Sequence, residues 1–287
     1  MASRSLQVWH VCRFEVARRL RSVSGLIALV SLVIASAVVG RQLAEAGRAL
    51  EKASTGRDAD GFRMMTEMVA SMADFPLETV QVSLEAHSPP LVGAFAFLMM
   101  VMPLLALTMG FDQCAGDIDT RHVRYLAFRI DRTTLYLGKL LGAWALISLT
   151  IAVAAVSMVG YIQVRMGSIP SAADVVYLGR SIITVCVAAL PLLTLLGLLG
   201  TLRGRARPVA LLTVLLWLAV GLSAAAARYG AESELLAQVI EVVWPTNGRW
   251  DLIFDEWASW GAGAARVLIY SIVVGALGLA HFRRRDL

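Results

Sequence analysis

The side chains best suited to bind another molecule gather in one polar segment, residues 112–139, between two long apolar runs. Apolar residues recur along its middle at helical spacing, so a short helix there would have one apolar face and one cationic face. Two acids near its start stand where helix N-caps and first-turn acids are favoured. The residues expected to contact a partner are the acids, cations and rings of this segment: Asp117, Asp119, Arg121, His122, Arg124, Tyr125, Phe128, Arg132 and Lys139.

A second interpretation of the same segment is a solvated loop with no partner. Lysine and arginine are abundant in the cytoplasmic loops of membrane proteins because they set the orientation of the neighbouring helices. The arginines of 112–139 would then report topology and nothing else. From this segment alone, both interpretations stay open.

The rest of the chain offers little chemistry for catalysis or for a cofactor. It lacks HExxH and GxSxG patterns, and Gly138-Lys139 is not preceded by the glycine loop that wraps a phosphate. Methionines at 64, 68 and 72 could bind Cu(I) as a thioether stripe, although the apolar face of a helix explains them more simply. The three cysteines have no metal-binding or CxxC spacing, and no disulfide is expected. We therefore expect neither an enzyme nor a resident cofactor.

Composition places the chain in a membrane. It is 58% hydrophobic over 287 residues with a mean hydropathy of +0.69, which is too apolar for a soluble domain. Topological arginines account for its net charge of +5, so no nucleic-acid partner is implied. We expect an all-α polytopic membrane protein forming one transmembrane domain with six transmembrane helices. The expected spans are residues 22–40, 89–111, 140–164, 181–202, 208–227 and 267–282.

The basic segment 1–21 is expected to be an amphipathic helix in the headgroup plane, with most of its arginines off the apolar face. That face would carry Leu6, Trp9, Cys12, Val16 and Leu20. Cleavage of this region as a signal peptide is the weaker alternative. Most lysines and arginines fall in short segments on the side of the two termini. The protein is therefore expected in a bacterial inner membrane, with both termini on the cytoplasmic side. Residues 41–88 would form an extracytoplasmic loop that could bind a further partner. Short outer helices are expected before the last span.

The six expected spans contain no Asp, Glu, Lys or Arg. Ion-coupled carriers usually need ionisable groups within the membrane, although discontinuous helices can use backbone carbonyls instead. A bundle without such groups needs an external source of free energy. A soluble nucleotide-hydrolysing partner would have to act on the N-terminal helix or on residues 112–139.

At these positions the chain resembles the ABC-2-type permeases, the transmembrane subunits of type V ABC transporters, and among them the permeases of nitrous oxide reductase maturation. Asp117 matches the family's acidic position, Ile130-Asp131-Arg132 its Val-Ser-Arg, and Gly138-Lys139 its Gly-Lys at the start of span three. Val123 takes the place of its leucine. Arg121-His122 replaces Gly-Thr and Arg129 replaces a proline, which are departures from the pattern.

The resemblance implies a half-transporter that pairs with a second permease copy, a homodimer, and with two cytoplasmic ABC ATPase subunits docked on Asp117–Arg132. Spans two and five would line the pathway, with candidate lining residues Met99, Met102, Met109 and Trp217. An apolar lining favours export of an amphiphilic substrate. The alternatives are a non-transporting mechanotransmitter or scaffold, and an ion-coupled secondary transporter.

Overall fold

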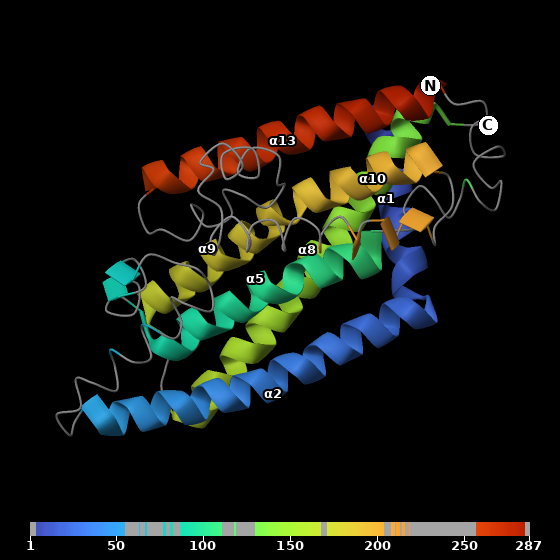
Figure 1. Ribbon diagram of the computed structural model, residues 1–287. Helices are drawn as coiled ribbons and strands as arrows, with labels where there is room; N and C mark the ends of the chain where they lie inside the picture. The colour runs from blue at the N-terminus through green and yellow to red at the C-terminus, as the bar shows by residue number, and fades with distance from the viewer. Residues whose placement is uncertain are drawn as a thin grey trace.

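The computed structural model describes residues 4–54, 87–110, 130–167, 171–203 and 257–284. It also describes positions 63, 67, 77–78, 81–82, 118, 208–209, 211–212, 214–215 and 218. These residues form helices joined by turns, with no strand among them. The helices are α1 (Arg4–Leu20), α2 (Val23–Ser54), α5 (Pro89–Gly110), α8 (Arg132–Met166), α9 (Ala172–Ala188), α10 (Leu190–Arg203) and α13 (Trp257–Arg284) (Figure 1).

Five helical runs are long and apolar enough to cross a membrane, since about 20 residues at ~1.5 Å each cover the hydrocarbon core. They are Gly25–Arg48, Pro89–Gly110, Arg132–Met166, Ala172–Arg203 and Trp260–Arg284. They coincide with the first, second, third, fourth and sixth predicted spans, so the chain is a helical multi-pass membrane protein. The predicted fifth span, 208–227, lies mostly outside the described residues, and its described positions from 208 to 218 are helical.

Three of these helices run well beyond the predicted spans. α2 continues past residue 40 to Ser54, α8 begins at Arg132 instead of 140, and α13 begins at Trp257 instead of 267. Hydropathy locates only the part of a helix that lies in the hydrocarbon. Polar residues can continue the same helix into water, where hydropathy does not mark its end. On α2 the extension carries an i,i+4 ion pair, Arg41 Nε to Glu45 Oε1 at 2.8 Å. Residues 41–54, expected to begin the extracytoplasmic loop, therefore continue the helix of the first span.

α8 is the central helix, and its described neighbours include every other helix of the bundle. Its inward face is formed by small and branched residues such as Ala143, Ile147 and Ala154, each fully buried. Met102 and Leu193 bring α5 and α10 into the same core cluster. A core built around one long helix holds the other helices at fixed depths.

Close contacts between helices fix their directions. Gly47 and Gly93 bring α2 and α5 together in antiparallel directions: Gly47 faces Pro90, and Gly93 faces Leu43. α13 runs parallel to the span formed by α9 and α10. Three contacts set this register: Thr184 of α9 with Trp260, and Thr194 and Leu198 of α10 with Gly275 and Gly278.

α1 lies at one end of the bundle and crosses the direction of α2, and the marked ends of the chain lie at this same end (Figure 1). The predicted apolar face of α1 is only partly the face that packs. Cys12, Glu15 and Arg19 are its buried residues, while Trp9 is 60% exposed. Arg19 is one of the arginines predicted to lie mostly off the apolar face, yet it is buried, because a carboxylate on the same face of α1 compensates its charge. The outward Trp9 remains available to lipid headgroups.

Candidate functional site: the junction of α1, α5 and α8

The predicted partner-binding segment is described only at its flanks and at Ile118. Most of the predicted contact residues lie outside the described residues: Asp117, Asp119, Arg121, His122, Arg124, Tyr125 and Phe128. Their role therefore stays a prediction. Arg132 and Lys139 are described, and both belong to α8 instead of a loop. The flanks of the segment are the end of α5 and the start of α8, and both meet α1 at a junction.

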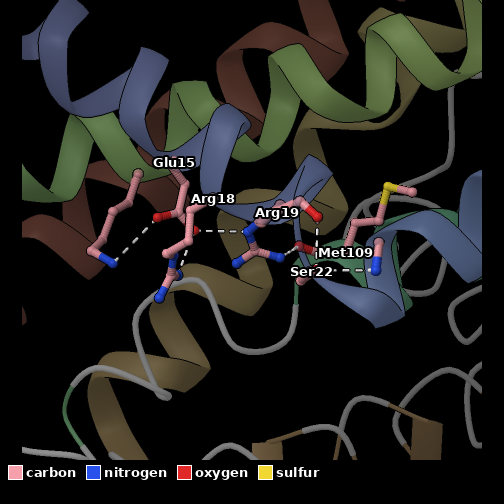
Figure 2. Close-up of polar contacts among 7 residues, drawn as sticks. Glu15, Arg18, Arg19, Ser22 and Met109 are labelled. Carbon is pink, nitrogen blue, oxygen red and sulfur yellow. Dashed lines mark hydrogen bonds and ion pairs between the residues drawn. The ribbon is translucent and has the colours of Figure 1, made fainter.

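A buried charge cluster holds this junction together. Glu15 Oε1 accepts hydrogen bonds from Arg19 Nε at 2.7 Å and from Arg18 Nη2 at 2.8 Å (Figure 2). Lys139 Nζ lies 3.8 Å from the second carboxylate oxygen. The side chains of Glu15, Arg19 and Lys139 are 3%, 10% and 5% exposed, so the ion pairs are shielded from water. One carboxylate thus compensates cations from two helices, α1 and α8.

Arg19 also connects the cluster to α5. Its Nη1 donates a hydrogen bond to the backbone oxygen of Met109, in the last turn of α5 (Figure 2). The last carbonyls of a helix have no partner within the helix and carry partial negative charge, so a guanidinium stabilises them. The Arg19 carbonyl in turn accepts from Ser22 Oγ at 2.7 Å, and Gly25 N donates to that hydroxyl at 3.1 Å. This turn sets the change of direction between α1 and α2.

The cluster keeps Glu15 ionised. Burial by itself would raise the pKa of this carboxyl, but the nearby charges of Lys139 and Arg19 and the hydrogen bonds from Arg18 and Arg19 outweigh it. The resulting pKa of Glu15 lies below its ordinary value. A carboxylate that stays charged at neutral pH can link α1 and α8 electrostatically.

Two glycines let α1 approach α8 closely. A Cβ on Gly138 would lie 2.6 Å from Val11 Cβ, and one on Gly142 would lie 2.9 Å from Glu15 Cβ. Their i,i+4 spacing is the small-residue pattern that brings membrane helices into close contact. This gives Gly138-Lys139 a physical role: the glycine admits α1 and the lysine meets Glu15. Lys139 is buried in this packing, and its contact with a soluble partner stays a prediction.

The other flank of the segment is attached to α13. Arg132 Nη1 donates to the backbone oxygen of Arg283 at 2.9 Å, near the end of α13. Leu135, Tyr136 and Phe282 form a small buried cluster that joins α8 to α13, with the rings of Tyr136 and Phe282 5.8 Å apart. Ile118 and Ile130, both within the segment, pack on this cluster. The helix end before residue 111 thus binds α1 through Met109, and the helix start after residue 131 binds α13 through Arg132.

The candidate pathway residues lie inside the single-chain core. Met99, Met102 and Met109 are at most 4% exposed, while Met100 on the same helix is 77% exposed. Trp217 lies outside the described residues. The lining role of these residues stays a prediction. Among the described residues, no group of three or more His, Cys, Asp and Glu side chains is placed to hold a metal ion.

Sequence reasoning missed Glu15, the centre of the junction. A signal was present: Glu15 is the only acid before residue 45, and it precedes Arg18 and Arg19 by three and four residues. A lone carboxylate within a basic helix is a candidate for internal pairing. Its third cation, Lys139, is distant in sequence and could be found only from the packing of α1 on α8.

No protein-family model matches the chain, and no curated protein matches it. Its function is inferred from its residues and contacts.

Proposed function

We propose that this chain is the transmembrane subunit of an ABC-2-type exporter. A separate cytoplasmic ABC ATPase, in two copies, docks on Asp117–Arg132 of the segment 112–139, and a second copy of the chain completes the transmembrane part. The complex lies in a bacterial inner membrane with both termini in the cytoplasm. ATP hydrolysis drives the export of an amphiphilic substrate.

The observation that carries this proposal is the double attachment of residues 111–131. One flank ends at Met109, which Arg19 of α1 binds, and the other begins at Arg132, which binds α13. A segment held by different helices at its two ends can convert a push from a soluble partner into relative movement of those helices. A solvated loop would need no such attachments, which favours the coupling interpretation.

The helix directions support a six-span topology. α10 and α13 are parallel, and Thr184 of α9, in the same span as α10, is paired with Trp260, so Arg203 and Trp257 lie at opposite ends of the bundle. We propose that the chain between them returns across the thickness of the bundle. With the five apolar runs this makes six crossings, of which 208–227 is the proposed fifth. An even number agrees with the shared end of the two termini in Figure 1.

The test is whether ATPase activity co-purifies with the chain. The tagged chain is purified in mild detergent from its native membranes, and vanadate-sensitive ATP hydrolysis is measured in the eluate. The double variant Arg121→Glu, Arg124→Glu should lose this activity at unchanged yield of the chain. Arg165→Glu, at the opposite end of α8, is the control and should keep it. Equal activity with both variants would reject the docking site, and no activity with the unaltered chain would reject the proposal.

The two alternatives predict other results. Ion-coupled transport would persist in vesicles without ATP and collapse when an ion gradient is dissipated. A mechanotransmitter would keep the associated ATPase activity but move no amphiphile in inverted vesicles. Uptake of a fluorescent amphiphile that requires ATP separates the proposed exporter from both.

A further inference from the structure

The fourth span is interrupted inside the membrane. Residues 172–203 form one apolar run long enough to cross, yet α9 ends at Ala188 and α10 begins at Leu190. Ala189 between them keeps helical dihedral angles (φ −76°, ψ −23°), and its backbone hydrogen bonds with Val185 and Leu193 have helical spacing, so the interruption is confined to the backbone hydrogen bonds next to Pro191. Pro191 explains the break, because its ring nitrogen cannot donate to the carbonyl four residues earlier and its ring crowds that carbonyl. In a membrane such breaks persist only where neighbouring groups satisfy the exposed backbone.

Two tryptophans from different helices bind the last turn of α9. Trp144 of α8 donates its indole N–H to the carbonyl oxygen of Cys186 at 2.9 Å. Trp260 of α13 donates its indole N–H to Thr184 Oγ1 at 3.0 Å. Thr184 and Cys186 lie just before the break, so both hydrogen bonds hold the same turn in place. An indole N–H that is removed from water normally requires such a partner.

The two halves of the span share their neighbours α5, α8 and α13 but differ in the main one: α9 packs most on α8, and α10 packs most on α13. α9 meets the outer half of α5, where the rings of Tyr177 and Phe95 are 6.3 Å apart in a T-shaped arrangement. α10 packs tightly on α13 through Gly278, where an added Cβ would lie 3.3 Å from Leu198 Cα. Helix pairs joined by such close backbone contacts tend to move as one unit. The break therefore separates two packing units.

α5 carries a second proline at the same depth. α5 runs parallel to α9 and α10, with Phe95 beside Tyr177 and Gly110 beside Leu193. Pro103 lies midway between Phe95 and Gly110, which places it opposite the last turn of α9. α5 and the span formed by α9 and α10 thus each lack a backbone hydrogen bond, because of a proline, at the same depth in the membrane.

We propose that this level is a hinge. The half of the bundle formed by α10, the adjacent part of α13 and the end of α5 tilts about Pro103 and the α9–α10 break. The indole hydrogen bonds of Trp144 and Trp260 hold the last turn of α9, against which this half tilts, in the arrangement described here. The hinge does not depend on the energy source. If the proposed coupling function holds, the junction would act on it directly, because Arg19 and Arg132 bind the ends of α5 and α13.

The hinge is tested by distance measurements across the break. Nitroxide labels are placed at Val176→Cys and Leu202→Cys, exposed positions of α9 and α10, in a chain whose own cysteines are replaced by alanine. Pulsed electron–electron double resonance in lipid nanodiscs gives the distribution of distances between the two nitroxides. The double variant Trp144→Phe, Trp260→Phe keeps the rings and removes both donors. Each lost hydrogen bond should increase the tilted population about two- to tenfold.

Three further variants make the result decisive. Pro191→Ala, added to the double variant, should narrow the distribution again because the backbone hydrogen bond can re-form. Thr184→Val removes a single acceptor at similar volume and should give a smaller broadening even if the double variant is too unstable to purify. Trp9→Phe alters an exposed tryptophan on α1 and should change nothing. Unchanged distributions in the double variant or in Thr184→Val, or no narrowing with Pro191→Ala, would overturn the hinge.

Discussion

Arg19 on α1 donates a hydrogen bond to the backbone oxygen of Met109 in α5, and it does so while paired to Glu15 on its own helix. A single guanidinium thus connects a helix at the edge of the bundle to the residues where the proposed coupling segment begins. Lys139 brings α8 into the same cluster. The segment returns to the bundle on α8, so the two helices that flank it share one electrostatic anchor. α1 is therefore part of the transmembrane bundle's framework as well as a candidate membrane-surface helix.

Glu15→Gln should destabilise the chain strongly. The neutral amide leaves Arg19 and Lys139 buried without a counter-charge, and breaking a buried ion pair in this way typically costs about 3–5 kcal/mol. The free energy of unfolding can be measured by titrating the detergent-solubilised chain with SDS. Glu45→Gln removes the carboxylate of an exposed i,i+4 pair on α2 and should change stability little. Equal effects of the two substitutions would show that burial of the cluster contributes nothing.

Acid should weaken the same junction. The pKa of Glu15 is below its ordinary 4.5 in the folded chain, so the unfolded chain binds this proton more tightly. The stabilisation is therefore complete above about pH 4.5 and is lost as the pH falls through the lower folded pKa. Unfolding midpoints measured from about pH 6 to about pH 3 should fall less steeply in Glu15→Gln than in the unaltered chain. Parallel curves for the two proteins would contradict this.

Alanine at the close-contact glycines should push α1 away from α8. A Cβ on Gly138 or Gly142 would come within 3.0 Å of Val11 or Glu15, whereas Gly160 on the same helix has nothing within 4 Å. Cys12 reports the change, because it is buried on α1 and burial raises the pKa of its thiol, which slows alkylation. Gly138→Ala and Gly142→Ala should accelerate alkylation of Cys12 by maleimide.

The matched control is Gly160→Ala, which should leave the rate unchanged and stabilise α8 by about 0.5–1 kcal/mol through helix propensity. Cys114 and Cys186 are replaced by alanine in every protein of this series, so that one thiol is followed. If all three glycine variants react at the same rate as the parent, the close approach of α1 to α8 is not maintained in the membrane.

Hydropathy was sufficient to predict that the chain is helical, multi-pass and preceded by a basic amphipathic helix. It located five of the spans because about 20 consecutive apolar residues can be buried only in lipid or in a large core. It could not locate the helix ends. α2 continues through Arg41 and Glu45 because their i,i+4 pair supports a helix in water, where hydropathy gives no signal.

The charge cluster at the junction of α1, α5 and α8 could not be predicted from the sequence for a different reason. An amphipathic pattern assumes that charged residues face water, and that assumption placed Arg19 outside. The structure turns Arg19 inward because Glu15 and the Met109 carbonyl compensate it, and Lys139 completes the cluster from a distant part of the chain. Long-range charge compensation needs the packing of α1 on α8, which two glycines set. The resemblance marked Gly138-Lys139 as important without supplying that cause.

Arg132→Ala should loosen the end of α13 with little loss of global stability. Arg132 is partly exposed and its guanidinium binds the carbonyl of Arg283, one of the last carbonyls of the helix, which have no intrahelical partner. Without it the last turn should open more often, and amide hydrogen exchange at residues 280–284 should increase about two- to tenfold, the equivalent of one hydrogen bond. Arg203→Ala, at the end of α10, is the control and should leave this exchange unchanged. Identical protection in both variants would mean that Arg132 does not anchor α13, and the second attachment of the coupling segment would be lost.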